Sequence, residues 1–223
     1  MHIPHGYLSP EISVGGYIAA LAVCAAAVRR ANRHLTEKEI PLLGVTAAFV
    51  FAAQMLNFKI PWGTSGHFLG ALMLGVLFGP LLSSLIMAVV LAVQCLAFAD
   101  GGFDALGANI LNMGVVAGTG CYYLFAFLKR VLPKTRAGFS TSVAIAAWLS
   151  IVLSSALCAV ELSLSGVFAL RVALPMMVGM HSLIGLGEAA VSVAVINLLA
   201  EGRPDLVPGW SPGGSAAVVA ERG

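Results

Sequence analysis

The stretch Pro80-Leu-Leu-Ser-Ser-Leu-Ile-Met-Ala-Val-Val-Leu-Ala-Val-Gln-Cys-Leu-Ala-Phe-Ala99 decides the fold, because it contains no charged side chain. At 1.5 Å per residue a helix of this length reaches about 30 Å, which is the thickness of the hydrocarbon core of a bilayer. Gly79 precedes the stretch, Pro80 is its first residue, and Asp100 follows its end. The stretch therefore predicts a helix that crosses a membrane.

The whole chain has the same character as this stretch. It is 59% hydrophobic and 10% charged, with a mean hydropathy of +0.95, whereas soluble domains carry about 25% charged residues. The net charge of +2 and the scattered basic residues do not suggest nucleic-acid binding. We predict an all-α, polytopic membrane bundle of about seven transmembrane helices. The predicted helices cover residues 11–31, 40–57, 66–79, 80–99, 107–128, 139–160 and 172–200.

The charges between the predicted helices suggest a topology. Arg29, Arg30, Arg33 and Lys38 follow the first helix, and no basic residue precedes it, which is the reverse of a signal peptide. The positive-inside rule then predicts an external N-terminus and a cytoplasmic C-terminus in the cell (inner/cytoplasmic) membrane. We expect residues 1–200 to form the transmembrane domain and 201–223 a flexible cytoplasmic tail.

The first two residues are a candidate metal chelate. If Met1 is retained, its amine, the His2 amide nitrogen and one His2 ring nitrogen provide three nitrogens. A metal that favours four in-plane nitrogens suits this set, so nickel or copper is expected before zinc. The alternative without a function is a solvated histidine in a frayed terminus, which is common in proteins.

The third predicted helix is too short to cross the membrane. Gly66 to Gly79 reaches about 21 Å at 1.5 Å per residue, so the helix should begin below the outer surface. The non-helical segment before it then dips into a recess that protein or water must line. We expect His67 at the floor of this outward-facing recess, with a helix-capping histidine as the alternative.

Four further polar residues are candidates for a supporting role. Asn109 and Asn112 are three residues apart after the loop 100–107, so both amides can face one recess. His181 and Glu188 are seven apart in the last apolar stretch, and ionisable residues within a membrane are by default candidates for function. Each pair has a structural alternative, which is to hold helices together.

Other features limit what this sequence can do by itself. It contains no G-x-x-x-x-G-K-[ST] loop, so partners would have to supply ATP hydrolysis. Cys24, Cys95, Cys121 and Cys158 lie inside predicted helices without C-x-x-C spacing, which favours buried apolar residues over a metal or disulfide framework. Small-x-x-x-small pairs such as Gly114 and Gly118 predict close helix contacts, within the chain or with another subunit.

Four stretches in order give the sequence a specific resemblance. They are Met1-His-Ile-Pro-His-Gly-Tyr-Leu-Ser-Pro10, Phe58-Lys-Ile-Pro-Trp-Gly-Thr-Ser-Gly-His-Phe-Leu-Gly-Ala71, Gly101-Gly-Phe-Asp-Ala-Leu-Gly-Ala-Asn-Ile-Leu-Asn-Met-Gly114 and Val178-Gly-Met-His-Ser-Leu-Ile-Gly-Leu-Gly-Glu188. With them the chain resembles the CbiM/NikM family, the substrate-binding (S) membrane component of energy-coupling-factor (ECF) nickel and cobalt transporters, which are ABC-type importers.

The resemblance implies a ligand set and partners. It implies that Met1 and His2 insert into the bundle and that His67 supplies the fourth nitrogen to a nickel ion, or alternatively to a cobalt ion. The implied partners are a transmembrane coupling protein, two cytoplasmic ATPase subunits and a small accessory membrane subunit. His5 stands where the family usually has Asp, so it could act as an alternate ligand or in metal delivery.

Two other functions stay open at this point. One is a membrane-embedded metalloenzyme that uses His67, His181 and Glu188 around a catalytic ion. The other is a metal channel or sensor that needs no ATPase. We favour the transport component, which is not an enzyme and has no catalytic residues, and we expect its metal binding to weaken as pH falls.

Overall fold

The computed structural model describes residues 1–35, 37, 40–60 and 64–210. Two three-residue strands, β1 (Phe58–Ile60) and β2 (Thr64–Gly66), form an antiparallel pair in which Lys59 lies opposite Ser65. All other regular elements are helical. They are α1 (Pro10–His34), α2 (Ile40–Met55), α3 (Ala71–Phe78), α4 (Pro80–Phe98), α5 (Leu106–Ile110), the π-helix η1 (Leu111–Gly120), α6 (Cys121–Val131), α7 (Arg136–Leu164), α8 (Leu170–Gly202) and the 3₁₀ turn η2 (Pro204–Leu206).

The helices make the predicted polytopic bundle. Because α5, η1 and α6 follow one another without a break, the helical segments number seven along the described chain. Five of them are long and apolar enough to cross a membrane, at 10–33, 80–98, 106–131, 136–164 and 170–202, and α2 is a shorter apolar helix. The fold class is therefore confirmed, while the side of the membrane on which each terminus lies stays a prediction.

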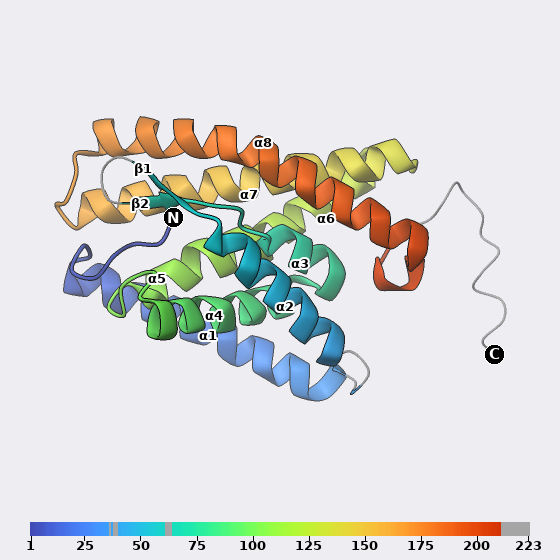
Figure 1. The fold of residues 1–223 in the computed structure, drawn as a ribbon, viewed down its shortest axis with the longest axis horizontal. Helices are drawn as coiled ribbons and strands as arrows, with labels where there is room; N and C mark the ends of the chain where they lie inside the picture. The colour runs from blue at the N-terminus through green and yellow to red at the C-terminus, as the bar shows by residue number, and fades with distance from the viewer. Residues whose placement is uncertain (36, 38–39, 61–63, 211–223) are drawn as a thin grey trace.

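The long helices surround the short third one. Helices α7 and α8 pack against each other along the molecule, and α1 lies with α4 and α5 across the bundle (Figure 1). Every residue of α3 from 71 to 77 is buried, since α4, η1 and α7 all contact it. The chain's N-terminus and the β1–β2 hairpin meet at one end of this core (Figure 1).

The third segment begins later than predicted. We expected a helix from Gly66 to Gly79, but only Ala71–Phe78 is helical, and residues 64–66 belong to β2. His67 consequently precedes the helix by four residues. It does not cap α3, because the N-cap position is Gly70.

Gly70 explains the late start of α3. Its φ of +75° lies in the left-handed region, which a right-handed helix cannot include and which only glycine adopts at little cost. A methyl group on this residue would also lie 2.9 Å from Val50 Cγ2. The backbone therefore turns sharply here before the helix begins.

The π-helix was not predicted, and it separates two residues that we expected to act together. Asn109 lies in α5, whereas Asn112 lies in η1, whose wider turn changes which residues share a face. Within the same stretch, Gly118 packs so closely on α4 that a methyl group would lie 2.4 Å from Ser83 Oγ. The Gly114 and Gly118 pair thus serves packing inside this chain.

The segment after α8 packs against the bundle as far as it is described. Val207 is buried, and the Trp210 ring lies edge-on to Phe139 with centroids 5.2 Å apart. This part of the expected tail, residues 203–210, therefore contacts the helices. The rest of it, residues 211–223, lies outside the described residues.

Candidate metal centre

The N-terminal segment inserts into the bundle as an extended strap, residues 1–5. The Asn109 side chain holds the strap with two hydrogen bonds to the backbone of Ile3. Its Oδ1 accepts from the Ile3 N–H at 2.9 Å, and its Nδ2 donates to the Ile3 carbonyl at 3.3 Å. The Gly102 N–H donates to the same carbonyl at 2.8 Å. The backbone N–H and carbonyl of Ile3 are thereby satisfied inside an otherwise apolar bundle.

The outer end of the strap is tied to the loop after α4. His5 Nδ1 lies 2.9 Å from Asp104 Oδ1, and the Gly6 N–H donates to Asp104 Oδ2 at 2.8 Å. A methyl group on Gly102 would lie 2.5 Å from the His5 nitrogen, so the loop can approach this closely only with glycine. His5 is exposed, and the structure gives it a tethering contact with Asp104.

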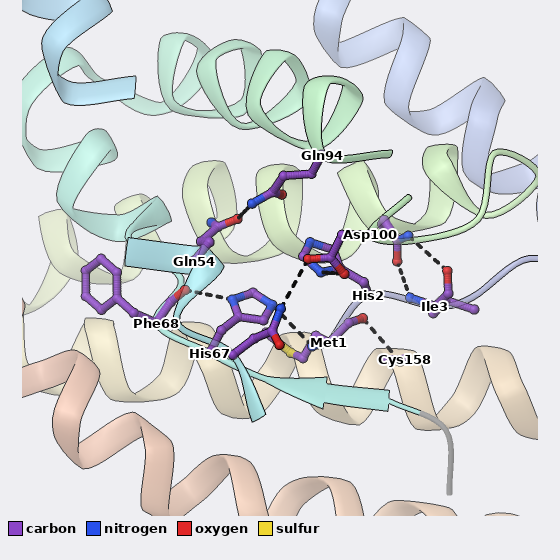
Figure 2. A network of polar contacts seen from close by, with 11 residues as sticks. Met1, His2, Ile3, Gln54, His67, Phe68, Gln94, Asp100 and Cys158 are labelled. Carbon is purple, nitrogen blue, oxygen red and sulfur yellow. Dashed lines mark hydrogen bonds and ion pairs between the residues drawn. The ribbon is translucent and has the colours of Figure 1, made fainter. Parts of the chain in front are cut away.

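The buried end of the strap brings three predicted residues together. The Met1 amine lies 3.3 Å from His67 Nε2, across 66 residues of sequence. The His2 and His67 rings stack with centroids 4.7 Å apart and planes 15° from parallel. Figure 2 shows Met1, His2 and His67 side by side. Their exposed fractions are 1%, 4% and 2%, so the predicted recess is filled by the strap.

Burial disfavours protonation of these nitrogens. It lowers the pKa of the Met1 amine from 8.0 to about 5. Burial is also the main reason why the pKa of His2 lies below its ordinary value, and why that of His67 lies well below it. The amine and His2 add to the effect at His67 because neighbouring positive charges repel a further proton. All three groups are therefore suited to donate lone pairs near neutral pH.

Asp100 is a part of the centre whose role the sequence did not reveal. Its Oδ1 lies 2.9 Å from His2 Nδ1, and Asn57 Nδ2 donates to its Oδ2 at 3.3 Å. Burial alone would raise the pKa of Asp100, but the hydrogen bond and charge of His2 outweigh burial and lower it. Asp100 is partly exposed, so it connects His2 to the surface.

Two glutamines from different helices lie beside the centre (Figure 2). Gln94 Nε2 donates to Gln54 Oε1 at 3.1 Å, and Gln54 Nε2 donates to the Leu69 carbonyl at 2.7 Å. Gln94 also favours the protonated form of His2 and so partly opposes the lowering of its pKa by burial. Both glutamines are fully buried in apolar helices. That placement was the sequence signal that could have identified them.

The remaining predicted residues lie around this group. Asn112 donates to Glu161 Oε2 at 2.6 Å, and Cys158 Sγ lies 4.0 Å from the Met1 carbonyl. His181 Nδ1 lies 2.8 Å from the Met177 carbonyl. Glu188 accepts two backbone N–H groups of residues 69 and 70.

The metalloenzyme arrangement does not form. Its three ligands would be His67, His181 and Glu188, but no group of three or more His, Cys, Asp or Glu residues that could hold a metal occurs among residues 1–35, 37, 40–60 and 64–210. The carboxyl oxygens of Glu188 are instead engaged by the backbone. The described residues therefore do not form the three-ligand site that this alternative requires.

Comparison with known proteins agrees with this architecture. Residues 2–206 match the family CbiM, described as the cobalt uptake substrate-specific transmembrane region. A putative fused nickel transport protein NikMN of Archaeoglobus fulgidus is 40% identical over 98% of this chain and 72% of its own length. A putative metal transport protein of Haloquadratum walsbyi is 39% identical over 93% of each chain.

A solved structure shares the fold. The crystal structure of a truncated transition metal transporter superposes with a TM-score of 0.83 at 32% identity, covering 91% of this chain and 99% of that one. These relatives and this structural neighbour are transporters rather than enzymes. With a family match across almost the whole described bundle, the chain belongs to the CbiM family of multi-pass membrane transport proteins.

Proposed function

We propose that this chain is the substrate-specific membrane component of an energy-coupled uptake system for nickel, with cobalt as the nearest alternative. The observation that carries the proposal is the 3.3 Å approach of the buried Met1 amine to His67 Nε2, beside the His2 ring. Two nitrogens each about 2.05 Å from one ion and at right angles lie about 2.9 Å apart. The observed distance therefore needs only a small adjustment to hold a metal.

His2 completes the plane in this proposal. Its amide nitrogen and Nδ1 close a six-membered chelate ring, and the Met1 amine with the same amide closes a five-membered one. Together with His67 Nε2 they give four nitrogens, which suits Ni(II) and disfavours tetrahedral zinc. Because Nδ1 lies 2.9 Å from Asp100 Oδ1, metal binding would exchange this contact for a bond to the ion.

The closed centre also supports a transport role. Metal bound there would be out of contact with water, so uptake requires the strap or its surroundings to open. Transport of the ion against its concentration gradient also requires energy. The sequence has no P-loop. We therefore assign that energy to partners of the ECF type, namely a transmembrane coupling protein, two ATPase subunits and an accessory membrane subunit. Relatives named as nickel and cobalt transport proteins support the choice of metal.

Metal binding is tested with the purified protein. Nickel chloride titrated into the native chain should give one bound nickel per chain, and His67→Ala should weaken binding by at least a hundredfold. The matched control is His34→Ala, which removes a histidine at the last residue of α1 and should leave binding unchanged. Equal binding by the native and His67→Ala proteins would overturn the proposed site.

Transport is tested in cells. Radioactive nickel should accumulate only when this chain is produced with the coupling protein and both ATPase subunits, and an inactivating substitution in the ATPase subunits should abolish accumulation. Accumulation by this chain alone would instead indicate the channel alternative. Nickel binding without accumulation in the full assembly would indicate a sensor.

A further inference from the structure

The turn that carries His67 is held by side chains from distant helices. Between β2 and α3, the Leu69 N–H donates to Glu188 Oε2 at 2.7 Å and the Gly70 N–H donates to Glu188 Oε1 at 2.8 Å. On the other side, Gln54 Nε2 donates to the Leu69 carbonyl at 2.7 Å. Glu188 therefore fixes two consecutive peptide groups at once, from the middle of α8.

One of these peptide groups also contacts the His67 ring. The Leu69 N–H and the Phe68 carbonyl belong to the same planar peptide unit, in which they point in opposite directions. The Phe68 carbonyl lies 2.7 Å from His67 Nδ1, as Figure 2 shows. When Glu188 fixes the N–H end of this unit, it also fixes the direction of the carbonyl end.

The contact determines which nitrogen of His67 carries the proton. A carbonyl oxygen can only accept, so Nδ1 must be the protonated nitrogen, and the neutral ring then has its lone pair on Nε2. That atom lies 3.3 Å from the Met1 amine. Metal-bound histidines commonly use their second nitrogen to donate to a carbonyl in this manner.

We propose that Glu188 is a positioning residue for metal binding. Through the Phe68–Leu69 peptide unit it orients the His67 ring and keeps Nδ1 protonated, so that Nε2 faces the strap as a donor. The proposal rests on the proposed function for the identity of the metal, but its effect on the ring exists before any metal binds. Glu188 itself does not ligate, because both of its oxygens accept backbone N–H groups.

The ring is tested first without metal. Nuclear magnetic resonance of the ¹⁵N-histidine-labelled full chain reports which ring nitrogen carries hydrogen, and His67→Ala assigns the signals. Native protein should show His67 protonated at Nδ1. Glu188→Gln, which replaces one acceptor oxygen with an NH₂ donor, should shift His67 toward the Nε2–H form. Native protein with hydrogen on Nε2 would overturn the proposal without any need for a variant.

Nickel affinity provides the second readout. Glu188→Gln should weaken nickel binding by about 10- to 100-fold, the usual effect of losing a partner that orients a ligand. The matched control is Glu161→Gln, which changes another buried carboxyl that pairs with Asn112 on a different helix, and it should leave both the tautomer and the affinity unchanged.

The outcomes separate this proposal from the proposed function. If the native chain does not bind nickel, the proposed function fails, while the tautomer measurement still tests Glu188. If the native chain binds nickel but Glu188→Gln keeps its affinity, or loses affinity with His67 unchanged, the role of Glu188 is overturned. An equal effect of Glu161→Gln would also overturn it, because the effect would then belong to any buried carboxyl.

Discussion

Docking of the strap should depend on pH because it buries the Met1 amine. The pKa of this amine falls from 8.0 to about 5 on burial. A base whose pKa is lowered in the docked form favours docking above its free pKa and opposes docking as pH falls. Each pH unit below 8 then costs about 1.4 kcal/mol, so the cost is about 3 kcal/mol at pH 6 and levels off near 4 kcal/mol below pH 5.

The same shift fixes how many protons nickel displaces. At pH 6 a docked amine with a pKa of about 5 is mostly neutral, and the pKa values of His2 and His67 are also lowered. Nickel should therefore release about one proton fewer from the protein than from a solvated terminus, because the docked amine has almost no proton to lose at pH 6. A solvated terminus with ordinary pKa values would release about three, from the amide, the amine and the partly protonated rings.

Calorimetry can count these protons. Nickel chloride is titrated into the purified protein at pH 6 in two buffers with different ionisation enthalpies, and the difference in heat gives the protons released per ion. A synthetic peptide of residues 1–10 provides the solvated reference. We expect fewer protons from the protein than from the peptide, by about one for the amine. Three protons from the protein would refute the burial of a neutral terminus.

Three further predictions concern the strap, the helix contacts and the choice of metal. Asn109→Ala removes both contacts to Ile3 and should weaken nickel binding roughly tenfold, because an unsatisfied buried polar group costs about 1–3 kcal/mol. Unchanged nickel affinity in a titration would contradict the role of Asn109. Gly107→Ala would place a methyl group 2.4 Å from the Tyr17 backbone nitrogen and should lower the melting temperature by roughly 3–10 °C. The control Gly15→Ala, whose methyl group would have nothing within 4 Å, should leave the melting temperature unchanged. Equal melting curves of the two variants would show that α1 and α5 tolerate separation. In competition titrations copper(II) should displace nickel while excess zinc should not, and displacement by zinc would argue against a planar nitrogen site.

The long helices could be predicted from the sequence because the length of each apolar stretch determines them. The segment 80–99 was expected and α4 covers Pro80–Phe98. The start of α3 could not be predicted in this way, because it depends on the left-handed Gly70 and on Glu188 from a distant helix. The π-helix could not be predicted either, because the hydrophobic pattern does not distinguish it from an α-helix.

The centre could be predicted only in part. Met1, His2 and His67 were chosen for their chemistry, and the structure brings them together. Asp100 was not identified, because its contact with His2 depends on where α4 ends relative to the strap. Long-range placement of this kind follows from the fold rather than from local sequence.

The central claim is that the amine of Met1 is a metal ligand, and one substitution-free change tests it most directly. Nickel binding is compared between the purified chain with its native terminus and a chain with two residues, Gly-Ser, added before Met1. The extension converts the amine into an amide and changes no side chain in the sequence. We predict one nickel per native chain and none for the extended chain at the same nickel concentration. Equal nickel binding by the two chains would contradict the claim.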